Sequence, residues 1–388
     1  MKKKIAILGS TGSIGKTLIN ILKKNKKDFE ITLLVINKNN KELLKQISMF
    51  DVKNIIVTNY KKFLEIKKKL KNRKINIYND FDCLSKIFKE KRIDYTMSAI
   101  SGIEGLIPST KIIKFTKKIA IANKESIICG WPLIKKELTK YNTKFIPIDS
   151  EHFSINELLN KCQDKDIEKV YITASGGPFN KYPIKKFKSI TPKSALRHPN
   201  WKMGKKISID SATMMNKVFE IIEAKKIFNL NYNKLEILVH PKSYVHAVVK
   251  FKNGLTKILI HDTNMIIPIF NSLYQDKKKN IKSKELDFTI INNLEFKKID
   301  IKRFPVTKIL KLLPAKHSLF ETLIVCVNDN LVQLFLKNKI KFTDISKILL
   351  RILENKHYTK YKQIMPKSID DIVKFNNYVS LKIKSLSI

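Results

Sequence analysis

The sequence has few cysteines, and the four that it has are far apart. Cys83, Cys129, Cys162 and Cys326 form no CxxC pair. Neither a disulfide framework nor a zinc site is therefore expected, and a reducing cytoplasm fits this composition. Long apolar runs are also scarce at the N-terminus, where only four apolar residues follow the first lysines before a glycine. We expect no signal peptide, no transit peptide and no membrane-spanning helix.

Arginine and acidic residues are scarce as well. The 388 residues include 72 lysines but five arginines, and 34 acidic residues leave a formal net charge of +43. Such a charge is typical of proteins that bind nucleic acid or anionic membranes. Proteins that read DNA grooves rely on arginine forks, however, and here the lysines are spread over every segment. We interpret them as a compositional bias and expect neither a specific nucleic-acid partner nor a membrane partner.

A glycine-rich turn near the N-terminus is the first sign of a ligand site. A short apolar strand, residues 5–8, runs into GSTGSIG and then into a helix that extends to Lys24. Gly9, Gly12 and Gly15 have a spacing that suits a dinucleotide-binding βαβ unit, which places phosphates at the helix N-terminus. Thr11 stands where the commoner fingerprint has glycine. The alternative is a tight turn before a helix that binds no ligand.

The next strand, expected over residues 31–36, bears on the choice of cofactor. It ends in Asn37-Lys38-Asn39 instead of the acid that holds the ribose of NAD. NADP is therefore favoured over NAD. Further strands near 54–58, 94–100, 118–123 and 143–148 alternate with helices and predict a doubly wound parallel sheet.

Polar residues follow two of these strands, at the edge where open α/β sheets bind ligands. Asn123-Lys124-Glu125 comes after the strand 118–123, although a solvated lysine is the ordinary expectation in so lysine-rich a chain. Asp149 and Glu151 come after the strand 143–148, and an extended backbone would point both carboxylates the same way. With Glu220 they could form a Mg²⁺ or Mn²⁺ site, because adjacent carboxylates repel unless a cation intervenes. An acidic strand end facing solvent is the alternative.

The segment from Ala174 to Glu220 has the most site-like composition. It contains SGGPF at 175–179 and RHPNWKMGKKISIDSATMMNKVFE at 197–220. We expect a short strand over 206–210, then a helix capped by Ser211 or Thr213. This helix would place Asn216, Lys217 and Glu220 in its first turns, where a phosphate would also bind. A capped surface helix with a polar face is the alternative, against which the Ser175-Gly176-Gly177 turn argues.

Two further regions complete the prediction. Residues 175–205 contain a glycine pair and four prolines, so we expect a mobile loop, here called the flap, whose Trp201 and Met203 close over substrate. Permanent packing of Trp201 in the core is the alternative. Residues 276–307 read as a linker with a strand-like piece at 287–292. Helices follow at 319–336, at 345–353 with a cap from Thr343 or Asp344, and after a Ser368–Asp371 capping box.

Together these motifs resemble 1-deoxy-D-xylulose 5-phosphate reductoisomerase over nearly the full length. They are GSTGSIG, NKES at 123–126, DSEH at 149–152, SGGPF, RHPNW and SIDSATMMNK with Glu220. The resemblance implies a cytoplasmic, homodimeric enzyme of isoprenoid precursor biosynthesis that uses NADPH and Mg²⁺, Mn²⁺ or Co²⁺. It would convert 1-deoxy-D-xylulose 5-phosphate to 2-C-methyl-D-erythritol 4-phosphate. The expected parts are an NADPH-binding Rossmann-like domain (1–149), an α+β catalytic and dimerisation domain (150–275), a linker (276–307) and a C-terminal helical bundle (308–388).

The resemblance also implies roles for residues of this chain. The metal would be held by Asp149, Glu151 and Glu220, which with Lys124 and His198 form the catalytic set. Substrate would contact Lys124, Ser150, Glu151, Ser175, His198, Trp201, Ser211, Asn216, Lys217 and Glu220. Cofactor would contact Gly9, Ser10, Thr11, Gly12, Ser13, Ile14, Gly15, Asn37, Lys38, Asn39, Ala99, Asn123, Lys124, Glu125 and Gly204.

Three positions depart from the family pattern: Asn37 replaces a glycine, Ile266 an arginine and Asp329 a glutamate. Two other protein classes stay open. A semialdehyde-type NADP dehydrogenase would need a nucleophilic cysteine, for which Cys129 and Cys162 have no catalytic setting. A nucleic-acid binder is suggested by charge alone.

Overall fold

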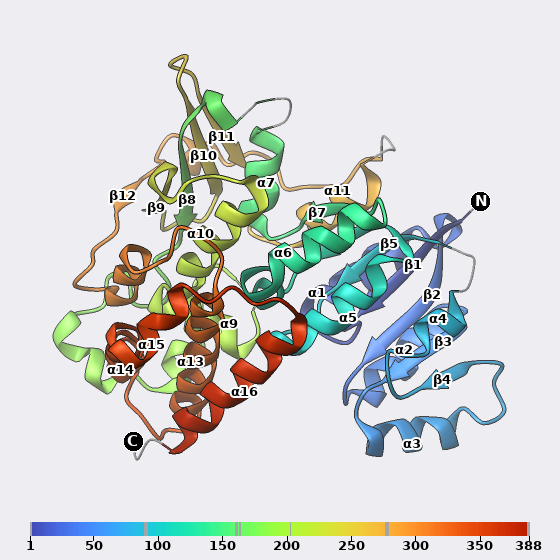
Figure 1. Ribbon diagram of the computed structural model, residues 1–388. Helices are drawn as coiled ribbons and strands as arrows, with labels where there is room; N and C mark the ends of the chain where they lie inside the picture. The colour runs from blue at the N-terminus through green and yellow to red at the C-terminus, as the bar shows by residue number, and fades with distance from the viewer. Residues whose placement is uncertain are drawn as a thin grey trace. The chain divides into compact units, whose positions relative to one another are not determined.

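The computed structural model (Figure 1) describes residues 2–88, 92–159, 162, 164–201, 203–275 and 279–385. By contacts the chain divides into two compact units. The first comprises Met1–Ile127, Trp131–Asp149 and Met265–Ile281, and the second comprises Ile128–Gly130, Ser150–Asn264 and Lys282–Ile388. The finer division into four segments expected from the sequence stays a prediction.

The first unit is built on a parallel sheet that, within the described residues, has seven strands in the order β4-β3-β2-β1-β5-β6-β7. The strands are β1 (Lys3–Leu8), β2 (Phe29–Ile36), β3 (Asn54–Val57), β4 (Asn76–Tyr78), β5 (Ile93–Ser98), β6 (Thr116–Ile121) and β7 (Lys144–Pro147). The order reverses between β1 and β5, which makes their carboxyl ends the topological switch point where such sheets bind ligands. The predicted α/β sheet is confirmed, whereas the short edge strand β4 was not predicted.

Helices cover this sheet because each presents an apolar face to it. They are α1 (Ser13–Lys24), α2 (Asn40–Met49), α3 (Tyr60–Lys69), α4 (Leu84–Ile87), α5 (Leu106–Ile113), α6 (Lys124–Lys140) and α11 (Ile266–Tyr274). Helix α11 joins this unit from far along the chain. It contributes Ile269 and Leu273 to the same core as Leu18 of α1, and Ser272 Oγ lies 2.8 Å from the hydroxyl of Tyr95.

The second unit has a mixed sheet that, in the described residues, has five strands in the order β11-β10-β8-β9-β12. They are β8 (Ile167–Ala174), β9 (Leu235–Val239), β10 (Val245–Phe251), β11 (Thr256–Ile260) and β12 (Lys297–Lys298). Strands β8 and β9 are parallel, while β10, β11 and β12 run antiparallel to their neighbours. Strand β11 lies at an edge of the sheet.

Helices pack around this sheet and form a bundle towards the C-terminus (Figure 1). They are α7 (Ser150–Leu158), α8 (Pro192–Ala195), α9 (Lys205–Thr213), α10 (Met215–Phe228), α12 (Phe288–Ile291), α13 (Leu319–Leu336), α14 (Phe342–Glu354), α15 (Lys356–Thr359) and α16 (Ile369–Ser385). Among the described residues, α13 alone is long and apolar enough to cross a membrane by length and composition, and 72% of its window is buried in the protein. That burial is typical of a core helix.

Three local predictions were wrong. Residues 206–210 belong to helix α9, where the alternating pattern is overridden by an ion pair of 3.1 Å between Lys206 and Asp210, one helical turn apart. The strand-like piece at 287–292 is helix α12, because the Asp287 carboxylate accepts the backbone N–H groups of Thr289 and Ile290. Helix α14 begins at Phe342, earlier than predicted, so Asp344 lies within its first turn, where its carboxylate still caps the helix by accepting the backbone N–H of Lys341 at 2.9 Å.

Other local predictions are confirmed. Helix α10 begins at Met215 and carries the Asn-Lys-Glu face, α13 has the predicted bounds, and Ser368 and Asp371 exchange the hydrogen bonds of a capping box. The predicted caps of α10 were wrong. Ser211 and Thr213 both lie inside α9, and Met214 precedes α10, although the Thr213 hydroxyl accepts the backbone N–H of Met215 at 3.4 Å.

Candidate active site

The glycine loop, residues 9–15, connects β1 to α1 at the switch point of the first unit. Gly9 has φ +85°, and a Cβ at this position would lie 2.6 Å from the backbone oxygen of Ala99 at the end of β5. A side chain at Gly9 would therefore be strained and would clash with the neighbouring strand end. The predicted residues Gly9–Gly15 and Ala99 are thus brought together by the backbone. Thr11 is half-buried, and Gly12 and Ser13 are exposed at the helix start.

The end of β2 presents its polar residues to solvent. Asn37, Lys38 and Asn39 are exposed. The Asn37 amide donates a 2.8 Å hydrogen bond to Thr58 Oγ1 beyond β3, and Asn39 Oδ1 accepts the backbone N–H of Glu42 as the cap of α2. Lys38 thus lies between two anchored amides, in a position that suits an anionic group.

Asn123 shapes the edge beyond β6. Its amide donates to the backbone oxygens of Ile100 and Gly102 at 2.6 and 2.7 Å, and its Oδ1 caps α6 through Ser126 N at 2.6 Å. Lys124, the first residue of α6, is buried and forms an ion pair with Asp149. The adjacent Glu125 is buried too. Lys124 is therefore not the solvated surface lysine of the ordinary expectation.

Three carboxylates form what we call the carboxylate cluster: Asp149, Glu151 and Glu220. One oxygen from each lies within 4.8 Å of the others. We predicted that an extended backbone points the Asp149 and Glu151 carboxylates the same way. This prediction was wrong, because the chain is not extended there. Strand β7 ends at Pro147, and Glu151 lies in the first turn of α7. Glu220, in α10, is fully buried, so a solvent-facing strand end does not describe this cluster.

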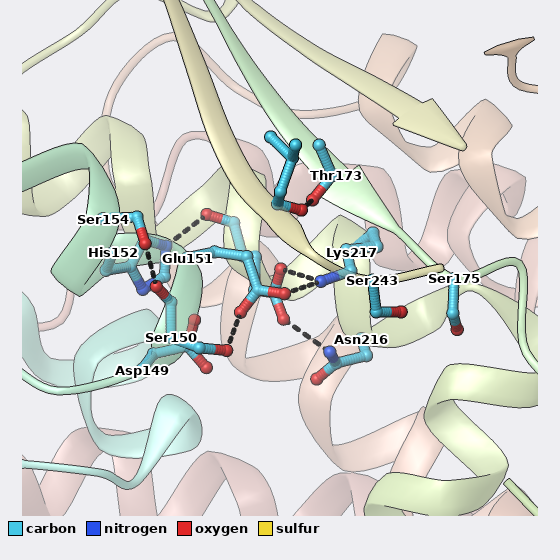
Figure 2. A network of polar contacts seen from close by, with 12 residues as sticks. Asp149, Ser150, Glu151, His152, Ser154, Thr173, Ser175, Asn216, Lys217 and Ser243 are labelled. Atoms are coloured by element: carbon cyan, nitrogen blue, oxygen red, sulfur yellow. Dashed lines mark hydrogen bonds and ion pairs between the residues drawn. The ribbon is translucent and has the colours of Figure 1, made fainter. Parts of the chain in front are cut away.

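Polar neighbours from α7 and α10 surround Glu151 and Glu220, and Figure 2 shows those of Glu151. The Lys217 ammonium donates to Glu151 at 2.5 Å and to Glu220 at 2.7 Å. Ser150 donates to Glu151 at 2.6 Å, and the Asn216 amide donates to Glu220 at 2.5 Å. Because like charges repel in a buried site, this arrangement requires a cation close by, and Lys217 supplies one.

The residues at the start of the flap lie beside the end of α9. Gly177 has φ +64°, and a Cβ there would lie 2.9 Å from the backbone oxygen of Ser211. Glycine therefore permits the close approach of two predicted phosphate-binding segments, around Ser175 and Ser211. Ser175 Oγ accepts the backbone N–H of Gly177 at 3.0 Å and lies 3.1 Å from His198 Nε2.

His198 has a fixed tautomer. Its Nδ1 accepts the backbone N–H groups of Asn200 and Trp201 at 3.2 and 3.0 Å, so the proton of the neutral ring is on Nε2. Burial and then the Lys217 ammonium lower the pKa of His198 from its ordinary value to about 4. Neutral His198 thus donates to Ser175 Oγ, and the Ser175 hydroxyl keeps its own proton for a ligand oxygen.

The middle of the flap is anchored to the loop before β10. The Asn200 amide donates to Pro241 O at 2.8 Å and to Ser243 Oγ at 2.9 Å. Trp201 is half-buried, and its indole meets the ring of His246 edge-on at 6.1 Å. Gly204 is exposed and precedes α9.

Comparison with known proteins decides the family. Residues 5–130 match 1-deoxy-D-xylulose 5-phosphate reductoisomerase, and residues 145–228 and 261–380 match C-terminal domains of the same enzyme. The reductoisomerase of Pelagibacter ubique is 62% identical over 387 residues, which are 100% of both chains. The chain belongs to the 1-deoxy-D-xylulose 5-phosphate reductoisomerase family.

Other members of the reductoisomerase family agree with this assignment. The enzyme of Sulfurihydrogenibium sp. is 38% identical over 95% of this chain and 94% of its own. The solved reductoisomerase of Zymomonas mobilis in complex with NADPH has 30% identity and a TM-score of 0.88 over 100% of both chains. A solved reductoisomerase with NADPH, fosmidomycin and magnesium has 28% identity and a TM-score of 0.90, over 99% of this chain and 98% of its own. The resemblance predicted from the motifs is confirmed.

The departures from the reductoisomerase pattern have local explanations at two positions. The Asn37 side chain is used to join the ends of β2 and β3 through Thr58. Asp329, in α13, forms a 3.0 Å ion pair with Lys206 of α9. At the third position, Ile266 begins α11 with 43% of its surface exposed, and nothing in the structure explains the change.

Sequence reasoning missed three residues near the site: His152, Ser243 and His246. His152 Nε2 lies 2.9 Å from the backbone oxygen of Glu220, within the second unit. Ser243 and His246 belong to HPKSYVH at 240–246, where a histidine pair and a proline follow a strand. This motif was visible in the sequence. It does not show which of its side chains face the flap, because that depends on how the strands pair.

Proposed function

We propose that this chain carries out the family reaction in isoprenoid precursor synthesis. It converts 1-deoxy-D-xylulose 5-phosphate to 2-C-methyl-D-erythritol 4-phosphate with NADPH and a divalent metal ion. The carboxylate cluster, closed by Lys217 and Asn216, is the single observation that carries this proposal. A simple dehydrogenase has no need of three converging carboxylates beside a phosphate-binding helix start.

The residues present fit a hard divalent cation. Asp149, Glu151 and Glu220 would hold Mg²⁺, Mn²⁺ or Co²⁺ through carboxylate oxygens, the ligands that such ions prefer. The bound ion would supply Lewis-acid polarisation of the substrate oxygens. Lys217 forms ion pairs with two of these carboxylates, and its ammonium would be available to the substrate phosphate if a divalent ion took over their charge.

The phosphate site is built from donors. Ser175, Ser211, Asn216 and Lys217 come from the start of the flap, the end of α9 and the first turn of α10. Neutral His198 keeps Ser175 oriented as a donor, which a phosphate oxygen requires. Lys124 and Ser150 would contact the sugar backbone on the side of the carboxylates, and the flap would close over it and exclude water.

Of the expected cofactor contacts, all but Gly204 belong to the first unit. The glycine loop offers backbone N–H groups of α1 to the NADPH diphosphate, and Lys38 with Asn37 and Asn39 would meet the 2′-phosphate. Among the described cysteines, Cys83, Cys129 and Cys326 are buried, and burial raises the pKa of the Cys83 and Cys326 thiols to about 12. The Cys83 and Cys326 thiols are therefore unreactive, which suits a reducing cytoplasm.

A homodimer is part of the proposal. Strand β11 is an edge strand of the second unit, and Leu255 and Ile258 beside and within it are 58% and 44% exposed. Exposed apolar residues on an unpaired edge favour pairing with a second copy of the chain. Sedimentation of the wild type and of Ile258→Lys tests this, and a monomeric wild type would contradict it.

The reaction itself is tested by incubating the purified protein with 1-deoxy-D-xylulose 5-phosphate, NADPH and Mg²⁺. Nicotinamide absorbance should fall in step with formation of 2-C-methyl-D-erythritol 4-phosphate. Chelation of the metal should stop both. Oxidation of NADPH without this product, or unchanged turnover after chelation, would overturn the proposed function.

A further inference from the structure

Two histidines beneath the flap form a stack that the described reaction does not use. The rings of His246 and His261 lie 3.7 Å apart between centroids and are inclined by only 12°. Both are at least nine-tenths buried, with 1% and 9% of their surfaces exposed. We call this pair the imidazole stack. Burying two polar rings costs free energy unless their N–H groups form hydrogen bonds.

The sheet builds the stack through an irregularity. The pairing of β10 with β11 shifts register between Val245 and Ala247, which makes His246 the extra residue of a β-bulge. A bulge turns a side chain away from the regular alternation of a strand. His261 follows β11 directly, so the two rings come from neighbouring strands at the bulge. Without this bulge, the regular alternation would not turn His246 in this way.

Hydrogen bonds to carbonyl groups lock both rings. His246 Nε2 lies 3.3 Å from the backbone oxygen of His261, and His261 Nδ1 lies 2.7 Å from the backbone oxygen of Asp262. A carbonyl only accepts, so both nitrogens are donors. His261 therefore holds His246 twice, by its ring and by its backbone. Any residue at position 261 could accept this hydrogen bond through its backbone oxygen, whereas the ring contact requires an aromatic side chain.

The stack continues on both sides as a row of aromatic contacts. Trp201 of the flap meets His246 at 6.1 Å with an interplanar angle of 78°, and Phe153 of α7 meets His261 at 6.2 Å and 66°. Both are edge-to-face contacts, which aromatic rings favour. Phe153 lies two residues after Glu151. The row thus connects the flap tryptophan to the helix that carries a carboxylate of the cluster.

We propose that His261 is a positioning residue: by stacking on His246 it fixes the ring against which Trp201 docks, and so sets the closed position of the flap over the substrate. The proposal rests on the proposed function insofar as the flap closes over a phosphorylated sugar. His261 itself has no part in the chemistry. Loss of its ring leaves one face of His246 uncovered, so that His246 and Trp201 are free to shift together.

Two substitutions separate the ring from the hydrogen bond. His261→Phe keeps a stacking ring and loses the donor to Asp262, whereas His261→Asn keeps a donor and loses the ring. We expect His261→Asn to raise KM for the sugar phosphate about fivefold while kcat changes less than about twofold, and His261→Phe to resemble the wild type. The dissociation constant of NADPH should not change. A merely structural defect would instead lower kcat through loss of active protein and leave KM unaltered.

A second readout needs no turnover. In a Trp131→Phe background, Trp201 is the remaining tryptophan. Its fluorescence should be more accessible to acrylamide in His261→Asn than in His261→Phe or in the parent, with exposed His357→Asn as the matched control. Equal quenching in all four proteins would overturn the inference. If the parent fails to turn over the sugar phosphate but the quenching still separates Asn from Phe, the proposed function fails and the role of His261 stands.

A double-mutant cycle tests whether His261 acts through Trp201. Since His261 acts through Trp201, the KM effect of His261→Asn should disappear in a Trp201→Ala background. Additive effects of the two substitutions would contradict the proposal. If His261→Asn does not fold, as judged by circular dichroism, His261→Leu replaces it in both measurements, because leucine fills the space without an aromatic face.

Discussion

The glycine loop of the first unit and the carboxylate cluster are built in different ways. At the glycine loop the backbone packs closely on a neighbouring strand end, and a side chain is excluded at Gly9, where a Cβ would meet Ala99 O at 2.6 Å. At the carboxylate cluster the contacts are made by side chains, and Lys217 bridges two buried glutamates. A backbone site tolerates changes in nearby side chains, whereas a cluster of buried charges fails when one member is altered.

The largest expected effect is therefore in the cluster. Glu220→Gln keeps the shape of the side chain but removes one negative charge, so turnover should fall by at least about a thousandfold. NADPH binding, measured by fluorescence titration, should stay nearly intact because the glycine loop is untouched. Glu236→Gln makes the same chemical change in a partly exposed ion pair with Lys169 and should leave turnover unaltered. Near-normal turnover in Glu220→Gln would sink the metal assignment.

A smaller effect is expected at the end of β2, where the site is open to solvent. NADPH should exceed NADH in kcat/KM, and Asn37→Asp should reduce this preference about tenfold, because a carboxylate there repels the 2′-phosphate and suits a free ribose hydroxyl. Steady-state kinetics with both cofactors measure it. Asn20→Asp on the exposed face of α1 adds the same charge elsewhere in the unit. An unchanged preference in Asn37→Asp, or equal use of both cofactors by the wild type, would refute the assignment.

The contrast between backbone and side chains is not absolute, because the segments around Ser175 and Ser211 also approach each other at a glycine, Gly177. Gly177→Ala should lower the free energy of unfolding by about 1–3 kcal/mol, since φ is +64° and the new Cβ would press on Ser211 O. Gly204→Ala, whose Cβ would meet nothing within 4 Å, should cost less than about 1 kcal/mol. Urea unfolding of both variants measures the two free energies. Equal costs would mean that the packing of the flap start on α9 is not tight.

The same contrast explains what the sequence could and could not predict. The glycine loop, the parallel sheet and the start of α10 follow from local periodicity and spacing, so they were predictable. Residues 206–210 alternate like a strand, yet they form α9 because Lys206 finds Asp210 one helical turn away and Asp329 on α13. The imidazole stack was beyond prediction, since it depends on a β-bulge and on the register of β10 with β11. Pairing between distant strands leaves no local pattern.

The smallest expected effect concerns pH and His198. Its pKa is lowered by burial, and then by Lys217, from the ordinary value to about 4, so the folded protein holds the neutral ring. Between about pH 6.5 and pH 4 the unfolded chain binds a proton that the folded chain refuses. The stability contributed by neutral His198 is thus fully present above this window and is lost as the pH falls through it.

Thermal unfolding of the wild type and of His198→Gln over this window measures the difference. We expect the midpoint of the wild type to fall more steeply with decreasing pH, while the two curves run parallel between pH 7 and pH 8. Other titrating groups are common to both proteins and cancel in the comparison. His357→Gln, which changes an exposed ring, should run parallel to the wild type throughout. Parallel curves for His198→Gln below pH 6.5 would mean that His198 accepts a proton in the fold, and its Nδ1 would then not be the acceptor for Asn200 and Trp201.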